Sequence, residues 1–139
     1  MRVAILGCGY VGIELGRRLS PAHDVVGVRR SSDGVAAVEA AGLRAVAADV
    51  TDADSLAAVP PVDAVVFAAS AGGRDATAAR WTYVEGQRTA IDALCGRADA
   101  PDRYLYTSSI GVYGDRDGAW VDEETALDPI TPREQALAD

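Results

Sequence analysis

The N-terminal stretch from Arg2 to Leu19 constrains the fold more than any other part of the sequence. It opens with the apolar run Val3–Leu6, which has the length and β-branched content of a strand buried on both faces. Gly7, Gly9 and Gly12 follow in the spacing G-x-G-x-x-G, and the residues after them have the periodicity of an amphipathic helix. The stretch therefore predicts a strand, a glycine turn and a helix.

Each glycine of this turn has a separate physical role. Gly7 permits the tight turn after the strand, Gly9 lets a pyrophosphate approach the backbone, and Gly12 allows the helix to pack against the strand. The unpaired N–H groups and positive dipole end of the helix suit a pyrophosphate without any lysine. We therefore expect a dinucleotide on Gly7, Cys8, Gly9, Tyr10, Val11 and Gly12. A purely structural turn, or another nucleotide-like ligand such as that of methyltransferases, is the alternative.

The second predicted strand, Val25–Val28, ends in Arg29-Arg30-Ser31. In NAD-binding units an acidic residue about 20 positions after the glycines accepts hydrogen bonds from the ribose, whereas arginine accommodates the 2′-phosphate of NADP. Arg29, Arg30 and Ser31 can donate several charge-assisted hydrogen bonds to one phosphate. The sequence thus predicts NADP, with NAD as the alternative, unless the two arginines are only exposed loop residues.

Further strands and helices alternate along the rest of the chain. Strands are expected at Leu43–Ala48, Asp63–Ala69 and Arg103–Thr107. Helices are expected at Gly34–Ala41, Asp75–Ala98 and from Pro132 to the end. A further helix is expected to run through Leu56, with Asp52 as its N-cap. In the longest helix, Tyr83, Ala90, Ile91 and Leu94 are expected to face the sheet. Such alternation implies parallel strands with right-handed crossovers. We predict an α/β fold, a Rossmann-type doubly wound parallel sheet of about five strands with helices on both faces, in one domain over residues 1–139.

Residues after two later strands extend the predicted cofactor site. Asp49 can accept a hydrogen bond from the exocyclic amine of adenine, and Val50 lies next to it. Ala68, Ala69 and Ser70 lead into small residues where the backbone and a ligand can come close.

Composition excludes several classes of function. The net charge of −8, with thirteen arginines and no lysine, argues against a nucleic-acid partner. No apolar run approaches the ~20 residues that span a membrane, and Met1-Arg2-Val3 leads directly into a strand, so we expect a cytoplasmic protein. Cys8 and Cys95 lack metal-ligand spacing and are expected to be reduced thiols, and no metal site is predicted. The acidic, lysine-free composition fits either a high-salt habitat or a GC-rich genome.

Four segments together resemble a known family. They are Gly7–Gly12, Asp49–Asp52, Tyr83–Gly86 and the S-S-I-G-V-Y-G run from Ser108 to Gly114. Their order and spacing resemble the extended and atypical NAD-dependent epimerase/dehydratase-like proteins of the short-chain dehydrogenase/reductase superfamily. The glycine motif alone also fits sugar-nucleotide 6-dehydrogenases. The resemblance implies NAD(P)-dependent chemistry on a hydroxyl or carbonyl substrate, which includes sugar-nucleotide-like molecules.

The catalytic residues that the resemblance implies are only partly present. The family uses a tyrosine as general acid/base, a lysine four residues later, and a serine or threonine that donates to the reacting oxygen, and Ser109 matches the last of these. Ser109 can also serve only to satisfy backbone groups at a strand end. Arg133 and Leu137 stand where the tyrosine and lysine are expected, and Tyr83 stands where many relatives have asparagine. Tyr113 is the first candidate for a replacement acid/base.

Two functions follow from these observations. The first is an NADP-dependent oxidoreductase or epimerase/dehydratase-type enzyme with an unidentified small-molecule substrate. The second is a catalytically inactive dinucleotide-binding module that acts as a sensor or protein partner. Extended relatives continue beyond the region that ends here at Asp139, which would leave an exposed sheet edge. We therefore expect either a fragment or a chain that pairs with a partner, a homodimer being one such arrangement.

Overall fold

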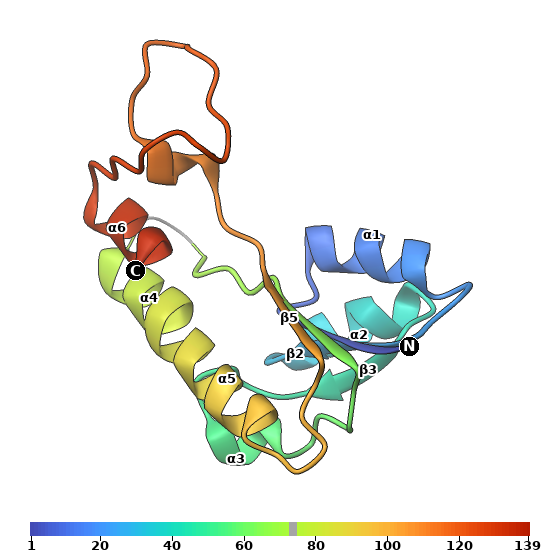
Figure 1. Cartoon of the computed structure of the whole chain (residues 1–139). Coiled ribbons are helices and arrows are strands. Elements are labelled where there is room, and N and C mark those ends of the chain that lie inside the picture. Colours follow the sequence, from blue (N-terminus) through green and yellow to red (C-terminus); the bar gives the residue numbers. More distant parts are fainter. Residues whose placement is uncertain (73–74) are drawn as a thin grey trace.

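The computed structural model describes residues 1–72 and 75–139 (Figure 1). Its described part contains a five-stranded parallel sheet in the order β3-β2-β1-β4-β5. The strands are β1 (Arg2–Leu6), β2 (Asp24–Arg29), β3 (Arg44–Ala47), β4 (Ala64–Phe67) and β5 (Arg103–Tyr106). The chain moves outward from β1 to β3, then returns to the other side of β1 for β4 and β5. This strand order confirms the predicted Rossmann-type sheet and places its topological switch point between β1 and β4.

Helices connect the strands and cover both faces of the sheet (Figure 1). They are α1 (Tyr10–Leu19), α2 (Ser32–Ala40), α3 (Ala53–Leu56), α4 (Ala76–Arg80), the π-helical segment η1 (Trp81–Gly86), α5 (Gln87–Cys95), the 3-10 helix η2 (Ile110–Tyr113) and α6 (Pro132–Ala138). Side-chain caps fix several starts. Asp52 accepts hydrogen bonds from the N–H groups of Asp54 and Ser55, which confirms its predicted role as the N-cap. Thr131 and Glu134 form a capping box at the start of α6.

The alternation of side chains along the strands produces two hydrophobic layers. On one face, Val3 and Ile5 pack with α1 and with Val38 of α2. On the other face, Leu6 and Phe67 pack with α3 and α5. Every residue of β4 is buried, as expected for a central parallel strand covered on both sides.

The helix predicted at Asp75–Ala98 has three parts, and the prediction for two of its side chains is wrong. α4, η1 and α5 follow one another without a break, and α5 ends at Cys95. Ala90 and Leu94 are buried against the sheet as predicted. Tyr83 is buried in a cluster with Ala136 of α6 instead, and Ile91 is 40% exposed. Ile91 follows Ala90 by one position, which is a rotation of roughly 100° around a helix, so both cannot face the sheet fully.

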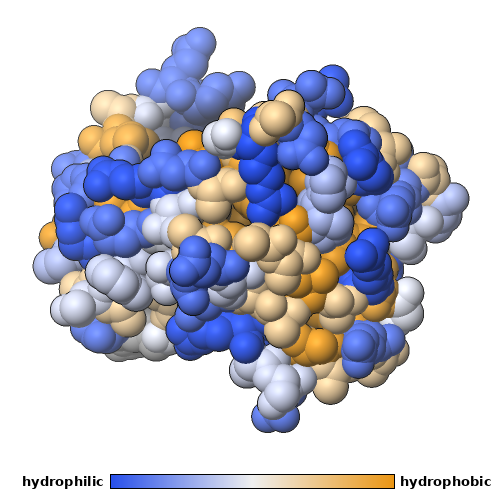
Figure 2. Space-filling view, turned by 90° about the horizontal axis from the view of Figure 1, so that it is seen from below, coloured by the Kyte–Doolittle hydropathy of each residue, from blue (hydrophilic) through white to orange (hydrophobic). Residues whose placement is uncertain are grey.

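The segment after β5 leaves the sheet before the chain returns as α6. Residues 107–131 form an arm at the top of Figure 1, and α6 packs beside α4. β5 pairs only with β4 among the described strands, so it is an edge strand as expected. Leu105 in this strand is 51% exposed. Figure 2 shows the molecule from below, with apolar side chains gathered on the right half of the view, the side on which Figure 1 draws the sheet, α1 and α2.

Two further predictions concern the chain as a whole. In the part of the chain that the structure describes, no helix has the length and apolar character needed to cross a bilayer. Cys8 and Cys95 are both free thiols.

Candidate functional site

The turn after β1 brings the carboxyl end of that strand against the end of β4. Gly7 has a φ of +74°, which confirms that the turn needs a residue tolerant of the left-handed region. A Cβ on Gly7 would lie 2.2 Å from the Cα of Ala69. No side chain can therefore replace the hydrogen at this position without moving the backbone of the residues after β4.

Gly12 provides the close contact between helix and strand that the motif predicts. A Cβ at this position would lie 2.9 Å from Cγ2 of Ile5 and 3.4 Å from Sγ of Cys8. The Cys8 side chain is itself fully buried, and burial raises the pKa of its thiol. The thiol therefore does not face a ligand, and the Cys8 N–H donates to the Val28 carbonyl oxygen at 3.0 Å.

The N-terminus of α1 has the properties of an anion site. The N–H groups of Tyr10, Val11 and Gly12 have no hydrogen-bond acceptor among residues 1–72 and 75–139. Gly9 is the N-cap and supplies no side chain, and the first turn carries no acidic residue. The side chains of Tyr10 and Val11 are 96% and 59% exposed, so they leave the backbone accessible. Free donors at a positive dipole end fit a phosphate group.

Arg29 lies across this turn. Its Nη1 donates to the carbonyl oxygen of Cys8 at 3.3 Å, and a Cβ on Gly9 would lie 2.8 Å from the same nitrogen. The side chain also packs along Gly34 at the start of α2. Ser31 caps that helix by accepting from the Gly34 N–H at 3.2 Å, which leaves its hydroxyl proton free to donate. Arg29 thus contacts both the glycine turn and the start of α2, where Ser31 is the cap.

Arg30 and Asp49 form a second part of the site, at the ends of β2 and β3. Arg30 Nη1 lies 3.5 Å from Asp49 Oδ2, while the Thr51 N–H and Oγ1 donate to Oδ1 at 3.0 and 2.8 Å. Burial opposes ionisation of Asp49, but the hydrogen bonds from Thr51 and the charge of Arg30 outweigh it and lower its pKa. The carboxylate stays ionised, and Oδ2 keeps capacity for another donor. The neighbouring Val50 packs with its Cγ2 toward Gly86.

The residues after β4 adjoin the glycine turn as predicted. The Ala68 N–H donates to the Leu6 carbonyl oxygen at 2.8 Å, and Ala69 is the close neighbour of Gly7. Ser70 and Ala71 then lead away from the sheet, and the Ala71 N–H donates to Tyr83 Oη at 3.3 Å. Gly73, which follows these small residues in the sequence, lies outside the described residues.

Ser109 and Tyr113, the two predicted catalytic residues, lie at opposite ends of η2. Ser109 is exposed, and its Oγ accepts from the Gly111 N–H at 3.3 Å, so it caps η2 and keeps its own proton available for donation. The described residues show no hydrogen bond between the side chains of Ser109 and Tyr113. Ser109 thus satisfies a backbone N–H, as the alternative to a catalytic role expects, but its hydroxyl can still donate a hydrogen bond to a substrate.

A Tyr83–Arg133 contact is the feature of the site that sequence reasoning missed. Tyr83 is 6% exposed. Burial acts to raise the pKa of its hydroxyl, but hydrogen bonding from Arg133, Ser70 and Ala71 and the positive charge of Arg133 lower it below its ordinary value. The two residues stand at two of the three positions at which this sequence departs from the family pattern, Leu137 being the third. That departure was visible, but nothing in the spacing showed that the two side chains meet.

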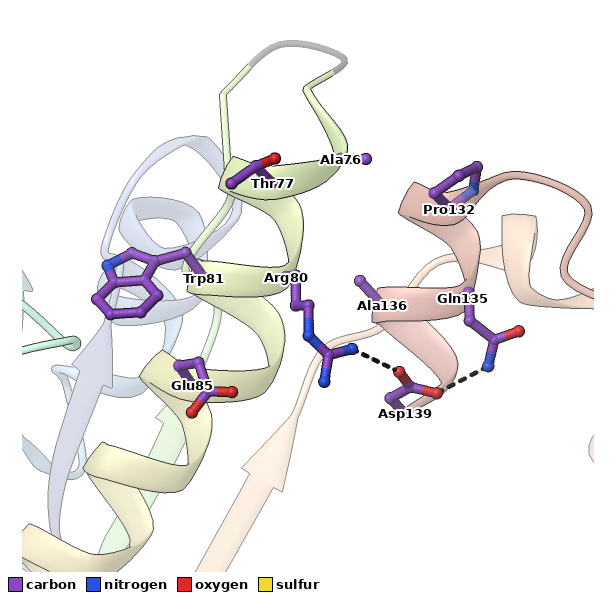
Figure 3. A pocket seen from close by; sticks show the side chains of 9 residues that line it. All are labelled: Ala76, Thr77, Arg80, Trp81, Glu85, Pro132, Gln135, Ala136 and Asp139. Atoms are coloured by element: carbon purple, nitrogen blue, oxygen red, sulfur yellow. Dashed lines mark hydrogen bonds and ion pairs between the residues drawn. The ribbon is translucent and has the colours of Figure 1, made fainter.

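A groove lies between α4, η1 and α6, on a different part of the surface. Figure 3 shows the Arg80–Asp139 ion pair of 3.2 Å beside it, with Gln135 donating to Asp139. Its lining is Ala76, Thr77, Arg80, Trp81, Glu85, Pro132, Gln135, Ala136 and Asp139. None of the residues predicted to bind a cofactor lines this groove. The described residues also contain no cluster of His, Cys, Asp or Glu that could hold a metal ion.

Comparisons with known proteins agree with this geometry. The sequence pattern of a family described as NAD(P)H-binding matches residues 7–139. No curated protein sequence matches the chain.

Three solved structures illustrate the likeness. A functionally unknown conserved protein from Silicibacter pomeroyi DSS is 28% identical, with a TM-score of 0.68 over 99% of this chain and 46% of its own. A short-chain dehydrogenase/reductase superfamily protein from Agrobacterium tumefaciens with bound NAD is 25% identical, with a TM-score of 0.78 over 99% of this chain and 42% of its own. A UDP-glucuronic acid 4-epimerase from Bacillus cereus in complex with NAD is 19% identical, with a TM-score of 0.74 over 99% of this chain and 49% of its own. The chain thus spans about half the length of these proteins.

Proposed function

The chain belongs to the NAD(P)H-binding family, as a Rossmann domain of the short-chain dehydrogenase/reductase and epimerase/dehydratase type, and from this premise we propose that it binds NADP(H) in preference to NAD(H). The observation that carries the proposal is the position of Arg29. Arg29 is the last residue of β2, the place where an NAD-selective protein has a carboxylate, and its guanidinium lies over Gly9. An arginine there removes a repulsive charge and offers a planar set of donors to a phosphate.

The rest of the site supports the same placement of the dinucleotide. In this proposal the pyrophosphate lies at the free N–H groups of α1, and the Arg29 guanidinium moves aside from its position over Gly9 to admit it. The adenosine half then lies over β2 and β3, with Asp49 as acceptor for the adenine amine. Arg29 and Ser31 are placed to donate to the 2′-phosphate, and Arg30 can join them by leaving Asp49.

The reaction we propose is oxidoreduction or epimerase/dehydratase-type chemistry at a hydroxyl or carbonyl carbon of a small molecule. The bound nicotinamide dinucleotide supplies the hydride acceptor or donor. In this proposal the Ser109 hydroxyl donates a hydrogen bond to the substrate oxygen as negative charge develops there. Two similar structures are of proteins described as acting on sugar nucleotides, a UDP-glucuronic acid 4-epimerase and a UDP-glucose 4-epimerase, which makes sugar-nucleotide-like substrates the first class to test.

One observation favours the alternative of a catalytically inactive binding module. α6 carries Arg133 and Leu137 at the positions of the tyrosine and lysine that the family pattern implies, and the chain contains no lysine. A sensor or partner protein needs only the dinucleotide site. Both functions fit a reducing compartment, because the two cysteines are free thiols, and we place the protein in the cytoplasm.

A binding titration followed by a turnover screen separates these functions. NADPH and NADH are titrated into the protein by calorimetry at low ionic strength, and sugar nucleotides and simple secondary alcohols are then screened for dinucleotide-linked turnover. Tighter binding of NADPH with turnover supports the enzyme. Tighter binding of NADPH without turnover supports the module, and the absence of binding to either dinucleotide contradicts both.

A further inference from the structure

The hydroxyl of Tyr83 lies where the ends of β4 and β5 meet α6. The Ala71 N–H, four residues after the end of β4, donates to Tyr83 Oη at 3.3 Å, and Ser70 acts on the same oxygen. From β5, Tyr106 is its titratable neighbour. From α6, Arg133 supplies the positive charge. In a doubly wound sheet, ligands bind outside the carboxyl ends of the strands, so this hydroxyl lies beside the proposed site.

The charge of Arg133 is unpaired among the described residues. It forms no ion pair with a carboxylate of the described residues, and its Nε is buried without a hydrogen-bond partner among them. A partly buried cation without a carboxylate favours ionisation of an acid beside it. Tyr83 is the acid in that position. The charged neighbours of Tyr83 on its own helix are engaged elsewhere, since Arg80 pairs with Asp139 and Glu85 with Arg88.

Two other tyrosines whose hydroxyl oxygens are buried, Tyr104 and Tyr106, show what Arg133 changes. Burial raises the pKa of Tyr104 and of Tyr106, and no cation lies beside either hydroxyl in the described part of the chain. Both hydroxyl oxygens also lack a hydrogen-bond partner there. Tyr83 is more deeply buried than either of them, yet its pKa is lowered. The difference comes from α6 and from the residues after β4.

The helix around Tyr83 is irregular in the same place. Tyr83 lies in η1, a π-helical segment, and such segments are rare and frequently occur at functional sites. The wider turn places Tyr83 in a cluster with Ala71, Ala79 and Ala136, at the contact between η1 and α6. The backbone irregularity therefore coincides with the tyrosine that meets the arginine.

We propose that Tyr83 is the catalytic acid/base of this site and that Arg133 is the positioning residue that keeps its hydroxyl ready to exchange a proton. The proposal rests on the proposed function as a dinucleotide-dependent enzyme. In the oxidation direction the substrate O–H bond breaks and its proton passes to the ionised Tyr83 Oη. The C–H bond on the same carbon breaks, the hydrogen leaves with its electron pair to the oxidised dinucleotide, and the carbonyl double bond forms. In the reduction direction Tyr83 returns the proton to the new alkoxide oxygen.

The first test uses the ligand-free full chain and therefore does not depend on cofactor binding. Tyrosinate absorbance is followed as the pH is raised, in the wild type and in Tyr83→Phe, Arg133→Leu and Arg133→Lys. We expect one tyrosine to ionise below the ordinary value of about 10, and its signal to disappear in Tyr83→Phe. Arg133→Leu should raise the midpoint of this transition by roughly one pH unit or more. Arg133→Lys keeps the positive charge, so its midpoint should lie close to that of the wild type. Tyr106→Phe is the matched control, since it removes a buried hydroxyl without a cation and should leave the transition in place.

The second test measures function. Tyr83→Phe should bind NADPH within a few-fold of the wild type and lose about 10²-fold or more in dinucleotide-linked kcat. Arg133→Leu should move the alkaline-side rise of the oxidation rate to higher pH, whereas Arg133→Lys should keep it near the wild type. Circular dichroism of each variant shows whether the fold is retained, and the Lys variant keeps the test decisive if the Leu variant unfolds.

Several outcomes would overturn the proposal. A ligand-free titration identical in the wild type and Tyr83→Phe would show that Tyr83 is no low-pKa group. Turnover kept by Tyr83→Phe and lost in Tyr113→Phe would assign the acid/base role to Tyr113 instead. If the protein binds NADPH and Tyr83 fails these tests, only the present proposal is lost. If neither dinucleotide binds, the proposed function is lost, and the acid/base role with it.

Discussion

The guanidinium of Arg29 lies directly over Gly9, with Nη1 2.8 Å from the position that a Cβ on Gly9 would occupy. The nearest backbone atom to that position, the Gly7 carbonyl oxygen, is 3.8 Å away. A side chain at position 9 would therefore displace a flexible arginine and fill the ligand's space, with little strain on the backbone. A substitution at position 9 should therefore impair ligand binding and leave the stability of the fold largely unchanged.

Gly9→Val should abolish dinucleotide binding while leaving the fold largely intact. The valine fills the space beside the free N–H groups of α1 and pushes Arg29 away. Calorimetric titration with NADPH and urea denaturation of the same variant check both parts. Gly7→Ala is the contrasting variant, because a Cβ there meets Ala69 Cα at 2.2 Å and the φ is positive, and it should lose about 1–3 kcal/mol or more of stability. A Gly9→Val protein that binds NADPH normally would contradict the assignment of the pyrophosphate to this turn.

Arg29→Asp combined with Arg30→Ala should erase or reverse a preference for NADP(H). Hydrogen bonds to a charged group contribute about 1.5–3 kcal/mol each, so two of them give a preference on the order of 10²-fold. Salt should weaken it, because the site is at the surface. The check is the ratio of NADPH to NADH dissociation constants at low and high ionic strength. Arg44→Ala, at the opposite end of β3, is the control and should leave the ratio unchanged. Equal affinity of the wild type for both dinucleotides would rule out the preference.

Phe67→Ala should destabilise the fold by about 3–5 kcal/mol. Phe67 is fully buried at the end of β4 and packs edge-on against Tyr106, with 5.9 Å between ring centroids. The loss should appear as a lower urea midpoint with an unchanged slope. Leu105→Ala on the neighbouring strand is a suitable comparison, because Leu105 is half exposed and its truncation should cost far less.

Asp49→Asn should lower the free energy of unfolding near neutral pH. It should also make that free energy less dependent on pH in the acidic range. The native pKa of Asp49 lies below its ordinary value of 3.8. The ionised carboxylate therefore stabilises the fold above about pH 3.8, and this contribution is lost as the pH falls through the lower native pKa. Unfolding free energies of wild type and variant should differ most near neutral pH and converge on acidification. Asp102→Asn is the control for the loss of one exposed carboxylate, because Asp102 forms no ion pair with the described residues. A difference that stays constant with pH would contradict the role of the charge.

The sequence predicted the order of strands and helices because each strand is a short apolar run bounded by strong local signals. Gly42 ends α2 with a φ of +79°, and Asp52 caps α3, both as expected from residue type. The ranges predicted for β3, β4 and β5 are one or two residues too long at their ends, since apolar residues such as Ala68 continue beyond the last ladder pairing of β4. The ranges predicted for β1 and β2 are too short, because the polar residues at their ends also pair in the sheet.

The candidate site was predictable only where its residues are close in sequence. The glycine turn and the arginines after β2 follow from fixed spacing along one β-α-β unit. The Tyr83–Arg133 contact joins residues from different helices, and it depends on how α6 packs beside η1. The π-helical geometry also has no local signal, because nothing in Trp81–Gly86 distinguishes a wide turn from an ordinary one before the surrounding helices are in place.

The wide turn at η1 sets the rotational phase between the two halves of the long helix. One extra residue in a turn rotates everything beyond it by roughly 100°. α4 can therefore direct its small residues toward α6, while α5 directs Ala90 and Leu94 toward the sheet. Deleting a single residue within Trp81–Gly86 would bring the halves into one regular helix and turn either Tyr83 or the α5 face out of its contact. The length of η1 is therefore fixed by two packing partners, α6 on the side of α4 and the sheet on the side of α5.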